Sequence, residues 1–367
     1  MKRTRFVNII IFVFVALAIT IFGLYRSSGV VVQPLMTEAV STTSLVPTSV
    51  VAAGVTSTFH AVPTVVTNQT TVVSIPAAPV SSTPAIEFPI RAAFYYPWFP
   101  EAWSQQGVAP FTHYHPLLGF YDSSDIKVIH QHIQEMLYGG ITAGISSWWG
   151  QGTPTDGRVR ELLGAATGSG FRWALYYEKE GIGNPSAAEI SNDLTYIRDR
   201  YAFDASYLKI NGRFVVFVYG EPNDDCGMAD RWKQGNTVNA YLVLKVFPKY
   251  MNCPNQPDSW HQYSPADATV NRSLSYTISP GFWKEGEETP RLTRDLSQWN
   301  SDILSMIASG SRFQLITTFN EWGEGTAIEP GQEWSSPSGY GAYLDALHDN
   351  GDPPAAVQPT ATAMPTP

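Results

Sequence analysis

Two glutamates flank a Trp-Gly pair near the end of this 367-residue chain, in the motif Asn-Glu-Trp-Gly-Glu at residues 320–324. The apolar run 313–316 just before it predicts a buried strand, which places the motif at a strand end. Cleavage of a glycosidic bond needs one carboxyl group that protonates the leaving oxygen and a second that offsets developing positive charge. Glu321 and Glu324 are therefore the predicted catalytic pair, and the chemistry that they indicate acts on carbohydrates.

The elements that would position this pair lie between residues 87 and 350, where apolar runs alternate with amphipathic ones. Strands are predicted at 91–96, 143–148, 172–177, 214–219, 241–246, 274–278 and 313–318, and helices at 122–138, 158–167, 187–201, 293–308 and 340–347. Strands separated by helices pair in parallel. The stretch of about 265 residues is typical of one α/β (β/α)8 barrel of the TIM type. The eighth strand is expected near 327–328 or merged with a neighbour.

Active-site groups of such a barrel come from the carboxyl ends of its strands. Aromatic rings there stack on the apolar faces of sugars, while carboxylates and amides orient hydroxyls. The residues predicted to contact substrate are Tyr96, Trp98, Trp148, Trp149, Glu178, Glu180, Glu221, Asn320 and Trp322. Neighbouring strand residues point to opposite faces, so one of Trp148 and Trp149 is expected to pack behind the barrel.

Each acidic candidate also has a simpler interpretation. Glu178 could pair with Lys179 or Arg172, Glu180 could simply begin the loop, and Glu221 could be a solvated loop acid. The histidine pairs at 113/115 and 130/132 lack a third ligand at metal-binding spacing, so no metal and no cofactor is predicted. The net charge of −9, without a basic stripe, excludes a nucleic-acid partner.

The two ends of the chain differ from its middle. Residues 1–26 join a basic start to an apolar run, 6–25, which approaches the length of about 20 residues that spans a bilayer. They are predicted to form an uncleaved signal anchor that leaves the following domain outside the cytoplasm and attached to the membrane. The alternative is a secreted protein released by signal cleavage. Residues 27–86 and 351–367, rich in Val, Thr, Ser and Pro, are predicted to be a disordered linker and a Pro/Thr-rich tail. In an oxidising compartment Cys226 and Cys253 are expected to form a disulfide.

The motifs taken together resemble glycoside hydrolase family 99 and its family-99-like relatives, which include endo-α-mannosidases. The resemblance covers about 91–330 and rests on Ala-Phe-Tyr-Tyr-Pro-Trp (93–98), Ser-Trp-Trp-Gly (147–150), Tyr-Tyr-Glu (176–178) and the segment 319–330. It implies a metal-free barrel that acts on α-linked, mannose-containing glycans with retention of configuration. Glu321 would act as base on the substrate 2-hydroxyl and Glu324 as acid/base, with a 1,2-anhydro sugar as intermediate.

The chain departs from the family motif at Gly323, where the family has His, and the loss of that side chain is expected to open the pocket. The alternative function is a catalytically silent carbohydrate-binding barrel at the cell surface. The intact pair of Glu321 and Glu324 favours the enzyme over this alternative.

Overall fold

The computed structural model of the protein describes residues 87–351, apart from positions 268, 272 and 273. The predicted anchor and linker lie outside the described residues, as does the tail from position 352 onward. Within the part that is described, no helix combines the length and the apolar character that a membrane span requires.

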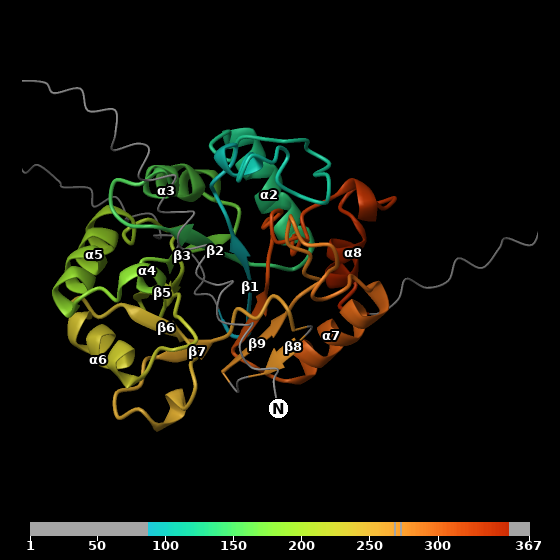
Figure 1. The fold of residues 1–367 in the computed structure, drawn as a ribbon. Helices are drawn as coiled ribbons and strands as arrows, with labels where there is room; N and C mark the ends of the chain where they lie inside the picture. The colour runs from blue at the N-terminus through green and yellow to red at the C-terminus, as the bar shows by residue number, and fades with distance from the viewer. Residues whose placement is uncertain (1–86, 268, 272–273, 352–367) are drawn as a thin grey trace, which may run out of the picture. The chain divides into compact units, whose positions relative to one another are not determined.

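Eight parallel strands form a nearly closed barrel in the described part of the chain (Figure 1). They are β1 (Ile90–Tyr95), β2 (Ala143–Trp148), β3 (Arg172–Tyr177), β5 (Arg213–Val218), β6 (Tyr241–Lys245), β7 (Ser259–His261), β9 (Ser275–Ile278) and β10 (Phe313–Ile316). Their order is β7-β6-β5-β3-β2-β1-β10-β9. Two short strands pair antiparallel at the edges, β4 (Lys209–Ile210) on β5 and β8 (Thr269–Asn271) on β9.

The barrel closes where β7 and β9 approach each other, which Figure 1 shows at the lower edge of the sheet. No backbone ladder joins these two strands among the described residues. Instead the Thr277 hydroxyl donates a 2.7 Å hydrogen bond to the carbonyl of Gln262, directly after β7. The Thr317 hydroxyl donates a 2.6 Å bond to the carbonyl of Tyr263. Side chains therefore complete the ring of strands.

Alternation along each strand separates two apolar layers, as expected for a sheet that is covered on both faces. Inside the barrel the Phe94 ring contacts Tyr176 at 4.9 Å and Phe217 at 6.5 Å between ring centroids. The side chains that point outward, such as Tyr95 and Trp173, pack with the apolar faces of the helices. Residues at the carboxyl ends of the strands therefore point either into the barrel mouth or behind the strands.

Helices surround the sheet in Figure 1. They are α2 (Ile126–Tyr138), α3 (Pro154–Ala165), α4 (Glu180–Gly183), α5 (Ala187–Arg200), α6 (Cys226–Gly235), α7 (Leu296–Ala308) and α8 (Ala342–His348). Short 3-10 turns lie at Glu101–Trp103, Tyr250–Asn252 and Gln332–Trp334. Several of the helices begin with a polar capping side chain. Helix α5 starts with a capping box, in which the side chains of Ser186 and Glu189 each accept a bond from the other's backbone N–H group.

The structure confirms the seven predicted strands, whose ends differ from the prediction by up to two residues. The eighth strand lies at a different place in the sequence from the one expected. The expectation near 327–328 is wrong, because the eighth parallel strand is β7, a three-residue segment paired with β6. Three residues are too few to give a periodic signal in the sequence. Helix α6 was also not predicted; its start is set by the Asp225 side chain, which accepts a bond from the Gly227 N–H.

Candidate active site

The loop that follows β10 turns sharply and brings two carboxyl groups to the mouth of the barrel. The Thr318 hydroxyl accepts a 2.8 Å bond from the Glu321 N–H, and the Glu321 carbonyl accepts one of 3.2 Å from Thr326. Gly325 adopts a φ of +67°, and a Cβ on it would lie 2.6 Å from the Trp283 carbonyl oxygen. Only glycine satisfies both conditions without displacing the neighbouring loop.

Glu321 and Glu324, three residues apart on this loop, are directly connected. The Glu324 N–H donates a 3.2 Å bond to Glu321 Oε1. Glu324 Oε2 accepts a 3.2 Å bond from the Tyr263 hydroxyl, which in turn accepts a 2.9 Å bond from the Tyr96 hydroxyl. Glu321 is buried, while Glu324 is half-buried. The loop thus presents one enclosed carboxyl group and one that solvent reaches.

Burial raises the pKa of both carboxyl groups. For Glu321 the negative charge of Glu324 raises the pKa further, and Lys284 counteracts part of the effect. For Glu324 the opposing influences are the Lys284 ammonium and the Tyr263 hydroxyl. Two neighbouring carboxyl groups that both resist ionisation titrate as a pair, so one proton is retained well above the ordinary pH range of a carboxyl group. A state with one acid and one carboxylate is what general acid/base chemistry near neutral pH requires.

A third acidic group, Glu178, follows β3 at the same end of the barrel. Burial raises its pKa to about 8, with Lys245 lowering it and Glu324 raising it. Lys245 donates a 2.7 Å bond to the Gly220 carbonyl and lies 4.2 Å from the centre of the Tyr219 ring. The alternative pairing of Glu178 with Lys179 is not seen among the described residues, since the Lys179 ammonium bonds Asp193 at 2.8 Å.

Other predicted contact residues also reach this end of the barrel. Tyr96 and Trp98 form a stacked pair at 4.5 Å, and Glu178, Glu321 and Glu324 each raise the pKa of the Tyr96 hydroxyl after burial itself. Trp98 is half-buried, as is Trp149.

Glu221, after β5, is half-buried, and burial raises its pKa while Lys245 lowers it. The barrel mouth therefore gathers several acidic groups and aromatic rings around two lysines, Lys245 and Lys284.

Two of the predicted contact residues are turned away from the mouth. Trp148 is the member of the Trp148/Trp149 pair that packs behind the barrel, as expected for one of them, whereas Glu180 was assigned to the mouth and is not found there. Trp148 is fully buried in the layer between sheet and helices, where its indole N–H donates a 2.7 Å bond to Asp156. Glu180 is 1% exposed and accepts bonds from Arg231 and from the Trp232 indole, the latter at 2.7 Å. Strand alternation and the short helix α4 direct these side chains behind the barrel.

Asn320 and Trp322 are likewise buried, and their side chains bond or stack with protein groups. Asn320 Oδ1 accepts a 2.7 Å bond from the Tyr96 N–H, and its Nδ2 donates a 3.1 Å bond to the Tyr96 carbonyl. This amide therefore joins the tip of β10 to the tip of β1. Trp322 stacks on Trp334 at 5.6 Å. Both residues shape the loop that carries the carboxyl pair, in place of the predicted contact with substrate.

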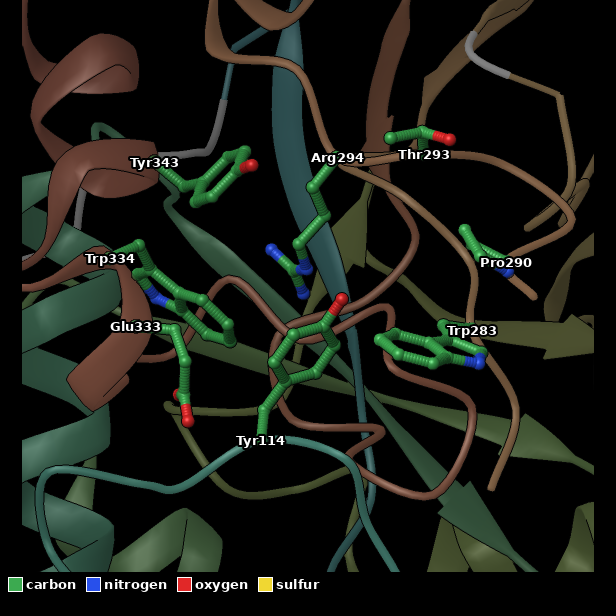
Figure 2. A pocket seen from close by; sticks show the side chains of 8 residues that line it. All are labelled: Tyr114, Trp283, Pro290, Thr293, Arg294, Glu333, Trp334 and Tyr343. Carbon is green, nitrogen blue, oxygen red and sulfur yellow. The ribbon is translucent and has the colours of Figure 1, made fainter. Parts of the chain in front are cut away.

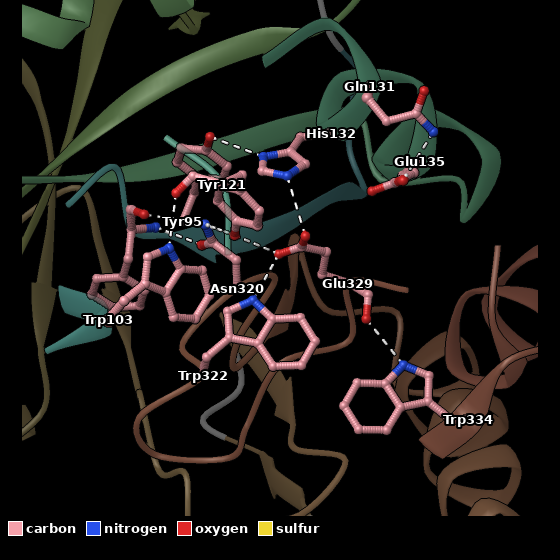
Figure 3. Close-up of polar contacts among 11 residues, drawn as sticks. Tyr95, Trp103, Tyr121, Gln131, His132, Glu135, Asn320, Trp322, Glu329 and Trp334 are labelled. Carbon is pink, nitrogen blue, oxygen red and sulfur yellow. Dashed lines mark hydrogen bonds and ion pairs between the residues drawn. The ribbon is translucent and has the colours of Figure 1, made fainter. Parts of the chain in front are cut away.

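A buried polar network supports the loop from behind (Figure 3). Its centre is Glu329, which is fully buried and accepts a 2.6 Å bond from the Tyr121 hydroxyl and a 2.8 Å bond from the Trp322 indole. Its other oxygen lies 3.3 Å from His132 Nε2, outside hydrogen-bond geometry. A buried carboxylate needs partners of this kind. Glu329 is thus the buried residue that holds the loop with the carboxyl pair in place.

The space beside Gly323 is filled, contrary to the expected opening of the pocket. A Cβ at this position would lie 3.0 Å from the Phe111 ring and 3.2 Å from Glu321 Oε1. Phe111 is buried. A neighbouring loop therefore occupies the space that a side chain at residue 323 would need.

Sequence reasoning missed three charged or polar members of the site, Lys245, Tyr263 and Lys284. Lys245 is the last residue of β6, and its place at the carboxyl end of a predicted strand could have revealed it. Tyr263 follows the unpredicted strand β7, so nothing in the sequence placed it. The predicted pair Cys226 and Cys253 does form a disulfide, which joins the start of α6 to the loop after β6.

Comparisons with known proteins add to this geometry. No protein-family model and no curated protein sequence matches the chain. The structure of a GH99 endo-alpha-mannosidase from Bacteroides thetaiotaomicron is similar with a TM-score of 0.59 and 18% identity, covering 72% of this chain and 96% of that one. The same enzyme in complex with BIS-TRIS-propane gives a TM-score of 0.59 at 19% identity, with the same coverage. A glycoside hydrolase-like protein gives a TM-score of 0.53 at 17% identity, covering 75% of this chain and 97% of that one. The resemblance that the motifs indicated is therefore confirmed in the fold: the described domain has the barrel architecture of a GH99 endo-alpha-mannosidase.

Proposed function

We propose that this protein is a retaining glycoside hydrolase that acts on α-linked, mannose-containing glycans. The observation that carries the proposal is the carboxyl pair on one loop, with the pKa of both groups raised and the Tyr263 hydroxyl donating to Glu324. The fold shared with an endo-alpha-mannosidase supports it, as do the motifs that gave the family resemblance. The preference for mannose and the mechanism rest on that resemblance.

In the proposed mechanism the bound substrate places the proton of the pair on Glu324, which donates it to the glycosidic oxygen as the bond from C1 to that oxygen breaks. Glu321 removes the proton of the substrate 2-hydroxyl, and O2 attacks C1 to form a 1,2-anhydro sugar. Water then opens this ring at C1 while Glu324 takes the proton of the water and Glu321 returns its proton to O2. Two inversions at C1 give net retention, and both carboxyl groups end in their starting states.

The placement of the two groups fits these roles. Residues three apart on a turn have Cβ atoms about 5–6 Å apart, which suits two adjacent oxygens of one sugar. Glu324, the more exposed of the two, is the one that a leaving group and then water must reach. The Tyr263 hydroxyl stabilises the charged form of Glu324 after proton donation, since a hydrogen bond to a carboxylate lowers its pKa.

The decisive experiment compares Glu321→Gln and Glu324→Gln on two kinds of α-mannoside. On an oligosaccharide, whose leaving group needs protonation, both variants should lose at least ~100-fold in kcat, the usual contribution of a general acid or base. On an aryl α-mannoside with a strongly acidic phenol, Glu324→Gln should keep most of its rate for release of the phenol, while Glu321→Gln should not. Equal losses on both substrates would contradict the assignment of roles.

A 2-deoxy-2-fluoro α-mannoside distinguishes the two routes to retention. Without a 2-hydroxyl the proposed mechanism cannot form its intermediate, so intact-mass measurement should show no adduct. A covalent adduct on Glu321 would instead identify that residue as a nucleophile. Binding of α-glycans with no cleavage of any of them would favour the carbohydrate-binding barrel over the enzyme.

We further propose that the domain is displayed outside the cytoplasm on an N-terminal membrane anchor. The basic and apolar start of the chain supports this, and so does the disulfide between Cys226 and Cys253, a bond typical of oxidising compartments. Sequencing the N-terminus of protein from membrane fractions tests it. A start at Met1 or Lys2 supports retention, whereas a soluble form that begins beyond residue 26 contradicts it.

A further inference from the structure

Two segments at the barrel mouth pack against each other beside the loop that carries the carboxyl pair. One is the segment 104–121 between β1 and α2, and the other is the segment 279–294 between β9 and α7. Their rings meet at Tyr114 and Trp283, whose centroids lie 6.2 Å apart, and Figure 2 shows both side chains reaching the same pocket. The His113 ring also stacks on Trp283 at 4.0 Å. The two segments therefore support each other where they meet the loop.

The second segment is bonded to the backbone of the loop. The Trp283 N–H donates a 2.9 Å bond to the Glu324 carbonyl, and the Glu285 N–H donates a 2.8 Å bond to the Gly323 carbonyl. Positions 323 and 324 are therefore fixed by backbone contacts with a neighbouring segment. The first segment reaches position 323 with a side chain, that of Phe111.

Phe111 and the Glu321 carboxyl group border the same small space. Phe111 is buried, and its backbone N–H donates a 2.8 Å bond to the Trp103 carbonyl. A Cβ at Gly323 would lie 3.0 Å and 3.1 Å from two carbon atoms of the Phe111 ring and 3.2 Å from Glu321 Oε1. The absence of a side chain at position 323 is what lets the ring and the carboxyl oxygen approach the backbone together.

The orientation of the Glu321 carboxyl group depends on such packing. Its Oε1 atom accepts the Glu324 N–H at 3.2 Å, which is longer than the usual length of about 2.9–3.0 Å for this kind of bond. A side chain that fills the neighbouring space restricts the carboxyl group to one rotamer and keeps water away from it. An apolar ring does this without offering a hydrogen-bonding group that would compete with the Glu324 N–H.

We propose that Phe111 is a positioning residue for Glu321: its ring, packed at Gly323, holds the carboxyl group against the Glu324 N–H and excludes water from it. The proposal rests on the proposed function, in which Glu321 is the base that acts on the substrate 2-hydroxyl. Phe111 is buried, so it acts through Glu321.

The test compares the full chain with its Phe111→Ala and Phe111→Leu variants on an α-linked mannooligosaccharide. Phe111→Ala should lower kcat by about 10- to 100-fold with little change in KM, the size of loss expected when a reacting group is displaced by about 1 Å. The acidic limb of the pH–rate profile should move to lower pH, because water that reaches Glu321 lowers the pKa that burial raises. Phe111→Leu keeps apolar bulk at this position and should restore most of both properties. Phe120→Ala removes a 48% exposed ring from the same segment and, as the control, should change neither.

Gly323→Ala probes the same space from the loop. Its Cβ would press on the ring and on the carboxyl group, so this variant alone should lower kcat. Adding Phe111→Leu makes room for the Cβ and should recover part of that loss. Losses that multiply in the double variant would mean that the two residues act independently, against the proposal. The control is Gly157→Ala on α3, where a Cβ meets nothing within 4 Å, and it should leave kcat unchanged.

A pH–rate profile of Phe111→Ala that coincides with that of the wild type would overturn the positioning role, even if kcat is lower. Failure of the proposed function is separate, because ¹³C NMR of protein with labelled glutamate follows the Glu321 carboxyl group without any substrate. The signal of Glu321 is identified by its absence in Glu321→Gln. A fall in the pKa of Glu321 in Phe111→Ala, in a protein that cleaves no α-mannoside, would retain the effect of the ring on the carboxyl group and contradict the hydrolase. An unchanged pKa would contradict the positioning role whether or not the protein is a hydrolase.

Discussion

Replacing Glu178 by Gln should stabilise the protein at alkaline pH, although the residue lies in the candidate active site. Glu178 is buried, with 7% of its surface exposed, and burial raises its pKa to about 8 from an ordinary value of 4.5. Between these two pH values the folded protein holds a proton that the unfolded chain has released. The free energy of unfolding therefore falls as the pH rises through this window.

The size of the effect follows from the width of the window. The gap between 4.5 and about 8 is roughly 3.5 pH units, and each unit corresponds to about 1.4 kcal/mol. The wild-type protein should therefore lose about 3 kcal/mol relative to Glu178→Gln between pH 4 and pH 7, and about 5 kcal/mol by pH 9. A neutral amide has almost the same shape as the protonated acid, so the two proteins should have nearly equal stability at the acidic end.

Thermal unfolding of both proteins at pH 5, 6, 7 and 8 measures this difference. At about 2 °C per kcal/mol for a domain of this size, Glu178→Gln should melt several degrees above the wild type at pH 8 and close to it at pH 5. Glu161→Gln, an exposed glutamate on α3, is the control and should follow the wild type throughout. A Tm difference for Glu178→Gln that stays constant with pH would refute the assignment of a buried, protonated carboxyl group.

Three further outcomes are expected. Lys284→Met removes a charge that lowers the pKa of Glu324, so the alkaline limb of the pH–rate profile should move to higher pH; a shift to lower pH would contradict the placement of the lysine. Glu329→Gln removes the charge of the buried carboxylate and so weakens the bonds that it accepts from Tyr121 and Trp322. The free energy of unfolding should fall by about 1–3 kcal/mol in a denaturant titration, with an unchanged midpoint as the contrary result. The double replacement Cys226→Ser/Cys253→Ser removes the disulfide between residues 27 positions apart and should lower the free energy of unfolding by about 2–4 kcal/mol. Dithiothreitol should lower the free energy of unfolding of the wild type but not that of the double variant.

The strands could be predicted because most of them are predominantly apolar segments of four to six residues between helices. The loop with Glu321 and Glu324 could be placed at a strand end for the same reason, since it directly follows such a segment. Strand β7 could not be found, because Ser259–His261 is three residues long and its strand geometry is imposed by pairing with β6. Because β7 was not predicted, Tyr263, whose hydroxyl donates to Glu324, was missed as well.

The directions in which side chains point were the second property that the sequence did not predict. The sequence places Trp148, Glu180, Asn320 and Trp322 at strand ends but does not say which of them face the mouth. Trp148 follows the outward register of β2, and Glu180 is rotated by helix α4 toward Arg231. Aromatic and acidic residues at a strand end thus either face the barrel mouth or pack behind the strands. The partner residue that determines which of the two occurs is usually distant in the chain.

The amide of Asn320, bonded to both backbone groups of Tyr96, has a consequence for biosynthesis. More than 220 positions separate these residues. The bonds between β1 and the loop after β10 can therefore form only after Asn320 has been synthesised. Under the proposed function, a chain that ends before this asparagine lacks both Glu321 and Glu324 as well as the bonds that join β10 to β1, and it should have no activity. Activity should therefore appear only late in synthesis, however many strands have already paired.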